Sequence, residues 1–385
     1  MADALIHAIA IACLTLAALG CGYALFATFV VRRFKGGALP LATAFPTVAV
    51  LKPLRGAEPT LQANLQSFCD QDYPAAIQWL FGVHDADDAA AAIVEALIES
   101  RPGRDLELCI TGGTAGSNPK VANLRGMQHR IRHDVVVIAD SDIAVAPDYL
   151  QRTVAALEQP GVGAVTYLYR GVPQGGVRAR LAAMAIDYYF LPNVLVGLAL
   201  GLAKPCFGST IALRRETLNA IGGFDAFREQ LADDYAIGAA VRRLGMRVAI
   251  PPLVVEHSFN ERTFAQLLRH ELRWARTVRV ADAAGYAGLV LTHPLPFAIA
   301  ATLFGNIAFG ITAIVASIAC RLVLQRQVEH TLGTRSLGIW LGPMRDLLSF
   351  AIYCASFFVG VVSWRGHRFR VRSDGTLLPL GDHKA

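Results

Sequence analysis

The sequence predicts an α/β domain, built on a mostly parallel sheet, between membrane-spanning segments near the two ends of the chain. Strand-like and helix-like apolar patterns alternate from residue 48 to residue 139, as in a sheet covered by helices. Long uncharged apolar runs lie near both ends of the chain. The composition is 54% hydrophobic and only 17% charged, with a mean hydropathy of +0.41, which is typical of membrane proteins.

The composition also excludes several classes of protein. The length of 385 residues exceeds one ordinary domain and can bury a large core. Seven scattered cysteines without a CxxC pair argue against a zinc site or a disulfide framework, and suit a reducing compartment. The formal charge is +6, but the basic residues flank apolar runs, which favours the positive-inside pattern over a nucleic-acid surface. These flanks are Arg32, Arg33 and Lys35 after the first run, and His367, Arg368, Arg370 and Arg372 after the last.

Three membrane spans are predicted. The first is Ile6–Val31, which is too long for a signal-peptide core of about 7–15 residues, and its basic flank places the following domain in the cytoplasm. The run Gly285–Cys320 contains two prolines and exceeds the roughly 20 residues of one span. It is therefore either one span near 296–320 after an interfacial helix, or a tight pair. The last span is Leu347–Trp364. The predicted segments are an anchor at 1–44, a cytoplasmic domain at 45–282, and interfacial and transmembrane helices with a basic tail at 283–385.

The elements of the central domain follow in order. The predicted strands are Val48–Leu51, Gln78–Val83, Leu106–Ile110, Val135–Ala139 and Phe207–Leu213. Helices are predicted from Leu61 and over Ala89–Ile98, Ala236–Leu244 and Phe264–Val280. Phe190–Ala203 is apolar but too short for a span, so it is either buried core or a dip into the bilayer. Ligands of such sheets bind at the carboxyl ends of the strands, where Asp85, Asp140 and Asp142 fall.

Asp140 and Asp142 are the first candidates for chemistry, because both follow a buried strand with one residue between them. Two such carboxylates can reach one hard cation, and Mg²⁺ commonly takes one or two carboxylates together with substrate phosphates. The alternative is a turn closed by aspartate hydrogen bonds. The surroundings at the end of a core strand favour a metal site.

Three further polar residues have a functional and a structural interpretation each. Asp85 could accept hydrogen bonds from a base or ribose, or be a solvated loop acid. Lys120 could meet a phosphate, or be an ordinary surface lysine. Asp234 could be the general base for an attacking hydroxyl, or stabilise a helix N-terminus through the helix dipole.

Arg273 and Trp274, within the stretch HELRWAR, also have two interpretations. Arginine can pair bidentately with a diphosphate, and tryptophan offers a flat face for a sugar or a lipid headgroup. Alternatively, the helix lies on the membrane and its arginines reach lipid headgroups. Those arginines are Arg269, Arg273, Arg276 and Arg279.

These motifs, in this order, resemble the GT-A glycosyltransferases and, more closely, the ceramide glucosyltransferase group of the family 21 and family 2 type. The matching stretches are LKPLRGAEPTLQANL, QDYP, GSNPKVANL, IADSDI, LADDY and the RW of HELRWAR. The resemblance covers about Val48 to Arg279, and LKPL…QDYP and NPKxNL are its most specific parts. The chain looks closest to a bacterial branch associated with hopanoid biosynthesis.

The resemblance implies a membrane-bound, inverting enzyme that transfers a sugar from a UDP-sugar to a hydroxyl of a membrane lipid. It implies that Asp85 contacts the nucleotide, that Asp140 with Asp142 holds Mg²⁺ or Mn²⁺, and that Asp234 is the base. Arg273 and Trp274 match the last motif, in which His270 stands where glutamine or arginine is expected. Asp142 rests on the coordination argument alone, so Asp140→Ala is expected to be the more damaging substitution.

The implied acceptor is bacteriohopanetetrol, receiving N-acetylglucosamine, or alternatively ceramide, receiving glucose. The implied location is a bacterial inner membrane, crossed several times, with the catalytic domain in the cytoplasm. Two competing functions are a processive polysaccharide synthase, for which three spans are too few to build a channel, and a non-catalytic scaffold, which the three acidic motifs disfavour. No nucleic-acid partner is expected.

Overall fold

The computed structural model describes residues 1–34, 42–112, 116–334, 337–358, 361–364, 367–371 and 376–379. The chain forms two compact units, each assembled from separate segments. The helical unit comprises Met1–Lys35, Gly175–Lys204 and Glu261–Ser363. The sheet unit comprises Gly36–Gln174, Pro205–Asn260 and Trp364–Ala385. The predicted segment 45–282 therefore contributes to both units, because residues 175–204 and 261–282 cluster with the helices.

The sheet unit is built on a seven-stranded sheet with the order β3-β2-β1-β4-β8-β6-β9. The first four of these strands in space are parallel, whereas β8 runs antiparallel to both β4 and β6. The fold class predicted from the sequence, a mostly parallel sheet covered by helices, is thereby confirmed. The strands are β1 (Val48–Pro53), β2 (Ile77–Val83), β3 (Asp105–Ile110), β4 (Val135–Ala139), β6 (Val162–Thr166), β8 (Thr210–Arg214) and β9 (Arg247–Ala249).

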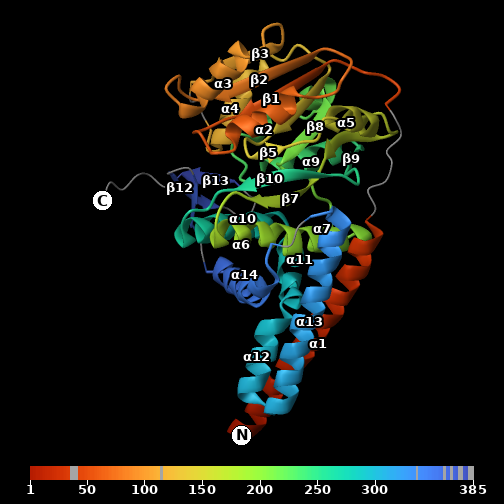
Figure 1. The fold of residues 1–385 in the computed structure, drawn as a ribbon, viewed down its shortest axis with the longest axis vertical. Coiled ribbons are helices and arrows are strands. Elements are labelled where there is room, and N and C mark those ends of the chain that lie inside the picture. The colour runs from red at the N-terminus through yellow and green to blue at the C-terminus, as the bar shows by residue number, and fades with distance from the viewer. Residues whose placement is uncertain are drawn as a thin grey trace. The chain divides into compact units, whose positions relative to one another are not determined.

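Helices cover both faces of this sheet (Figure 1). Successive side chains of a strand point to opposite faces, and β1 shows the consequence. Val48 and Val50 belong to one core with α2 (Leu61–Cys69), α3 (Ala89–Glu99) and α5 (Tyr149–Leu157). Ala49 and Leu51 belong to a second core with α4 (Pro119–Gln128), α8 (Arg215–Ala220) and α9 (Asp233–Arg243). Burial on both faces explains why these strands read as continuous apolar runs.

A second, three-stranded sheet has the order β5-β10-β7. Its strands are β5 (Ile143–Ala144), β7 (Leu168–Pro173) and β10 (Val254–Phe259). Because β5 follows directly after Asp142, its antiparallel pairing places Ile143 opposite His257. Near the chain end β12 (His367–Val371) pairs antiparallel with β13 (Leu377–Pro379), and β11 (Val361–Trp364) precedes them.

In the helical unit, α1 (Ala2–Arg33) packs against α12 (Pro294–Phe304) and α13 (Ile307–Leu332), as Figure 1 shows. Small residues allow the close approach: a Cβ added at Gly20 would lie 2.9 Å from Pro294 Cβ. The remaining helices of this unit are α6 (Val177–Ala185), the π-helical turn η1 (Ile186–Phe190), α7 (Leu191–Ala199), α10 (Phe264–Ala281), α11 (Ala283–Gly288) and α14 (Gly342–Ser356). Short 3₁₀ turns are η2 (Phe224–Phe227), in the sheet unit, and η3 (Leu289–Thr292) and η4 (Ile339–Leu341), in the helical unit.

Three helices in the described part of the chain are long and apolar enough to cross a membrane, namely α1, the run Val177–Ala199 and α13. A fourth candidate is the bent pair Ala283–Thr292 and Pro294–Phe304, which meet at 58°. The break at Gly305-Asn306 separates α12 from α13, so the run Gly285–Cys320 contains the bent pair followed by most of the span candidate α13. An 18-residue window of Val177–Ala199 is 67% buried. Within residues 190–203, however, the buried side chains are Leu191, Pro192, Leu195 and Val196, whereas Leu200 and Leu202 are 53% and 75% exposed, so this segment is core only in its first part.

The predicted last span, Leu347–Trp364, is wrong. The helix α14 has 15 residues and ends at Ser356, so at 1.5 Å per residue it is about 22 Å long, short of the roughly 30 Å hydrocarbon core. The strand β11 covers Val361–Trp364, where β-branched and aromatic residues favour extended backbone. The apolar run that was interpreted as one span therefore contains the end of a short helix and a strand.

Candidate active site

The loop between β4 and β5 carries Asp140 and Asp142 at the carboxyl end of the parallel strands. The backbone N–H of Asp140 donates to Ser209 O at 3.2 Å, which ties this strand end to the start of β8. Burial raises the pKa of Asp140 above its ordinary value, while the Lys120 ammonium acts to lower it. The loop thus presents a carboxylate whose charge depends on a neighbouring cation.

Lys120 supplies that cation. Asn118 caps α4 by accepting from the backbone N–H groups of Lys120 and Val121 at 2.9 and 3.1 Å, and Pro119 occupies the first turn. Lys120 Nζ lies 2.7 Å from Asp140 Oδ1 and 3.7 Å from Asp233 Oδ2. Burial acts to lower the pKa of Lys120, but the surrounding carboxylates outweigh it and raise that pKa. Lys120 is therefore a buried cation held by acids and not a surface lysine.

Asp234 is in the first turn of α9, and its carboxylate lies beside the Lys120 ammonium. Its Oδ2 accepts from the backbone N–H of Gly208 at 2.7 Å, and its Oδ1 accepts from that of Tyr235 at 2.8 Å. Lys120 Nζ donates to the carbonyl of the same Gly208 at 3.3 Å. Burial raises the pKa of Asp234 to about 6, and the Asp233 carboxylate adds to the increase. A carboxyl with a pKa close to neutral is suited to proton transfer.

Asp142 faces a histidine that the sequence analysis did not identify. His257 Nε2, on β10, lies 3.0 Å from Asp142 Oδ2, and the backbone N–H of Ser258 donates to Asp142 O at 2.9 Å. The sequence signal was three consecutive polar residues, Glu256 to Ser258, inside a strand. That His257 contacts Asp142, 115 positions earlier in the sequence, follows only from the pairing of β10 with β5.

The donor chemistry at this loop fits a hard divalent cation. Carboxylate oxygens from Asp140 and Asp142 are suitable ligands for Mg²⁺ or Mn²⁺, and the imidazole of His257 contacts one of these carboxylates. Within the described residues, no group of three or more acidic, histidine or cysteine side chains is arranged to hold a metal by itself. Phosphate oxygens and water would therefore complete the coordination, as is common for Mg²⁺.

Asp85 lies apart from this cluster. It is exposed in the turn after β2, where Asp88 caps α3 by accepting from Ala90 N at 2.9 Å. His84 Nε2 lies 3.2 Å from Pro119 O, so the turn borders the start of α4. The position at a strand end agrees with the sequence analysis, and a role in nucleotide binding stays a prediction.

Arg273 and Trp274 lie on α10 of the helical unit, whereas Asp85, Lys120, Asp140, Asp142 and Asp234 lie in the sheet unit. The His270 ring packs edge-on against Trp274 with centroids 4.4 Å apart, and its Nδ1 lies 2.8 Å from Glu261 Oε1. The residue that departs from the family motif thus supports the tryptophan.

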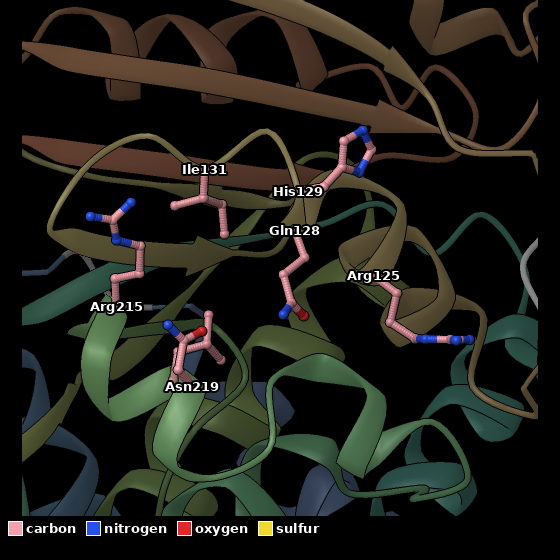
Figure 2. A pocket seen from close by; sticks show the side chains of 7 residues that line it. Arg125, Gln128, His129, Ile131, Arg215 and Asn219 are labelled. Atoms are coloured by element: carbon pink, nitrogen blue, oxygen red, sulfur yellow. The ribbon is translucent and has the colours of Figure 1, made fainter.

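A cavity of about 320 Å³ lies elsewhere in the sheet unit (Figure 2). Arg125, Gln128 and His129, toward the far end of α4 from Lys120, contribute to its lining. Its two arginines are already paired: Arg125 with Asp225 at 2.7 Å and Arg215 with Asp134 at 3.6 Å. This cavity does not contain any of the predicted site residues.

Comparison with known proteins identifies related sequences. Residues 12–377 match the profile of glycosyl transferase family 21. Ceramide glucosyltransferase 1 of Caenorhabditis elegans is 24% identical over 346 residues, which cover 86% of this chain and 73% of that protein. The ceramide glucosyltransferase of Komagataella phaffii is 32% identical over 126 residues, 31% of this chain and 24% of that protein. An N-acetylglucosaminyltransferase of Rhizobium leguminosarum bv. viciae is 23% identical over 244 residues, 60% of this chain and 55% of that protein.

A solved structure shares the fold. The mannosyltransferase PcManGT from Pyrobaculum calidifontis, in complex with GDP-Man and Mn²⁺, matches with a TM-score of 0.53 and 22% sequence identity. The match covers 92% of this chain and 98% of that one. The sheet unit accordingly has the GT-A fold.

Proposed function

Because the chain belongs to glycosyl transferase family 21, and is therefore a glycosyltransferase, we propose that it moves a sugar from a UDP-sugar to a hydroxyl of a membrane lipid, with inversion. The observation that carries this proposal is the arrangement of Asp234 and Lys120 around Gly208, with Asp140 2.7 Å from the lysine. This arrangement brings a carboxyl group suited to proton transfer close to a buried cation and to the loop that carries the two candidate metal ligands, Asp140 and Asp142.

In this mechanism Asp234 accepts the proton of the acceptor hydroxyl, whose oxygen attacks the anomeric carbon in line with the departing UDP. Gly208 and Tyr235 donate to both carboxylate oxygens of Asp234 and so orient it. Asp140 and Asp142 would hold the Mg²⁺ or Mn²⁺ together with phosphate oxygens, and the ion would supply positive charge to the leaving diphosphate. We propose that Lys120 balances the charge of Asp140 and Asp233 and meets a phosphate of the donor.

The roles of three other residues rest on the family resemblance. We propose that Asp85 contacts the nucleotide, and that Arg273 and Trp274 of α10 contact the donor diphosphate and sugar. Arginine suits a diphosphate because its planar fork can pair bidentately with phosphate oxygens.

Two acceptors are candidates. The sequence resemblance favours N-acetylglucosamine transfer to bacteriohopanetetrol, and the similarity to the rhizobial N-acetylglucosaminyltransferase is consistent with that sugar. The names of the nematode and yeast relatives favour glucose transfer to ceramide. In either case the acceptor arrives from the bilayer. We propose, from the family resemblance, that the protein lies in a bacterial inner membrane. The sheet unit would face the cytoplasm, because α1 ends in Arg32 and Arg33 and basic flanks favour the cytoplasmic side.

The test uses membranes containing the full chain, supplied with labelled UDP-N-acetylglucosamine or UDP-glucose and with bacteriohopanetetrol or ceramide. One donor–acceptor pair should give a labelled lipid, with inversion at the anomeric carbon, and chelation of divalent ions should stop its formation. Labelled polymer instead of a single-sugar lipid would favour the processive synthase. Absence of product from every pair, at confirmed expression, would contradict the proposal.

A further inference from the structure

Two sequence motifs are left without a role by the proposed mechanism: the LKPL…ANL stretch and the following QDYP. In the structure polar side chains of these two motifs, and Ser67 between them, contact the backbone of the segment Asp140–Ala146, here called the acid segment. Three of these side chains, Lys52, Asn64 and Gln71, are almost completely buried, at 0%, 3% and 6% exposure. Buried polar groups of this kind are retained where they make specific hydrogen bonds.

The first anchor is Lys52, near the carboxyl end of β1. Its Nζ donates to the carbonyl of Asp140 at 2.7 Å and to that of Ile143 at 3.4 Å. The ammonium also lies 3.8 Å from the centroid of the Phe68 ring. Since β1 and β4 are neighbouring parallel strands, a long side chain at the end of β1 reaches the loop that follows β4.

The second anchor is one face of α2 and its continuation. Asn64 and Ser67, at positions i and i+3 of α2, share a helix face, and Gln71 follows two residues after the helix ends at Cys69. Asn64 Nδ2 donates to Ser141 O at 3.0 Å, and Ser67 Oγ accepts from Val145 N at 3.2 Å. Gln71 Nε2 donates to Ala146 O at 2.9 Å, and its Oε1 accepts from Leu150 N at 3.0 Å.

Together with the bond from Ser258 N to Asp142 O, these contacts engage four consecutive carbonyls, those of residues 140 to 143. A short loop held in this way cannot rotate its peptide groups independently. The side chains of Asp140 and Asp142 therefore start from a fixed backbone, and ordering them costs little when a ligand arrives.

We propose that Lys52, Asn64, Ser67 and Gln71 are positioning residues, forming a cradle that holds the acid segment ready for a divalent cation bound to the donor diphosphate. This inference rests on the proposed function, since it assigns the cradle to that metal site. Groups that orient metal ligands typically alter metal affinity by about 10–100-fold when they are replaced.

The experiment compares Asn64→Leu with Gln78→Leu in the purified full chain in lipid nanodiscs. Gln78 is a matched control, because it is also fully buried and holds a backbone segment, through Arg130 O at 3.0 Å and Arg132 N at 3.2 Å. It does so at the opposite end of the sheet. Mn²⁺ binding in the presence of UDP is measured by electron paramagnetic resonance, and the Tm is measured without either ligand.

Asn64→Leu should weaken Mn²⁺ binding about tenfold or more, whereas Gln78→Leu should change it less than twofold even if its Tm falls further. Excess Mn²⁺ should restore most of the turnover of Asn64→Leu. Lys52→Met is expected to act like Asn64→Leu, and the milder Ser67→Ala provides a variant that keeps the fold if Lys52→Met does not.

Equal Mn²⁺ affinities in the wild-type protein, Asn64→Leu and Ser67→Ala would overturn the cradle. The cradle would also be overturned if Asn64→Leu and Gln78→Leu lost the same amount of Mn²⁺ affinity. If the wild-type protein bound neither Mn²⁺ nor UDP, the proposed function itself would fail, and this inference with it.

Discussion

Both units of the molecule bury clusters of charged side chains, but the two clusters differ in balance. In the helical unit two buried arginines have one acidic partner each: Arg345 pairs with Glu271 at 2.6 Å and Arg321 with Asp346 at 3.0 Å. In the sheet unit Lys120 faces two acids, Asp140 and Asp233, with Asp234 beside them. The first cluster is closed and electrically matched, whereas the second has surplus negative charge.

The difference separates a structural role from a chemical one. A matched, fully buried pair has no capacity left for a ligand, and losing one partner leaves an uncompensated charge. A cluster with surplus carboxylates can accept a cation or a proton, and burial raises the pKa of both Asp140 and Asp234. We therefore expect substitutions in the helical-unit pairs to change mainly stability, and substitutions around Lys120 to change mainly activity.

The largest expected effect is on stability. Glu271→Gln should lower the free energy of unfolding by about 3–5 kcal/mol, because it leaves the buried Arg345 guanidinium without an ionic partner. Thermal unfolding in detergent, followed by circular dichroism, measures the change. The exposed pair Arg132–Asp105 of the sheet unit is the control, since its side chains are 60% and 45% exposed and Arg132→Met should cost less than about 1 kcal/mol. A double substitution of Glu271 and Arg345 to leucine should recover part of the loss.

Lys120→Met tests the other cluster. We expect kcat/KM to fall about 100-fold, or about 2.7 kcal/mol, with a smaller change in Tm than for Glu271→Gln. The Lys120 ammonium acts to lower the pKa of Asp234, so its removal should also move the acidic limb of the pH–rate profile to higher pH. Arg125→Met on the same helix is the control. A loss of Tm without a shift of the acidic limb would assign Lys120 a purely structural role.

Gly208→Ala should have the smallest effect of the three substitutions, and it should act on the activity through the contacts around Gly208 alone. A Cβ at this position would lie 3.1 Å from Asp234 Oδ2 and 3.2 Å from Lys120 Nζ, so both groups must move by a few tenths of an ångström. We expect kcat to fall about fivefold to tenfold, or about 1.4 kcal/mol at most, at an almost unchanged Tm. Gly22→Ala, where an added Cβ meets nothing within 4 Å, is the comparison. Equal activity of the two variants would show that the geometry around Gly208 is not critical.

Local patterns in the sequence were sufficient for most of the sheet unit. The strand Val135–Ala139 was predicted with its observed limits, because residues buried on both faces give a continuous apolar run. The candidates Asp140, Lys120 and Asp234 could be identified because each is a charged residue at or near the end of a strand or the start of a helix. Their grouping around Gly208 depends on β8 returning beside β4, which no local pattern reveals.

The remaining features depend on contacts that are distant in sequence. His257 meets Asp142 only through the pairing of β10 with β5, and Lys52 reaches Asp140 across two neighbouring strands. The end of α14 was missed for a different reason. Hydrophobicity alone does not distinguish a span from a short helix followed by a strand, so residues 347–364 were read as one segment.

The most direct test of the central claim is the pH dependence of kcat/KM for lipid glycosylation, measured for the wild-type protein and for Asp234→Asn. Because the base must be ionised and its pKa is about 6, wild-type activity should be full above that pH and fall tenfold per unit below it. Asp234→Asn should lose about 10²–10⁴-fold of the activity and should lack this acidic limb, while Asp225→Asn, at an exposed acid of the same unit, retains both. An Asp234→Asn variant that keeps the wild-type rate, or keeps the limb near pH 6, would contradict the assignment of Asp234 as the base.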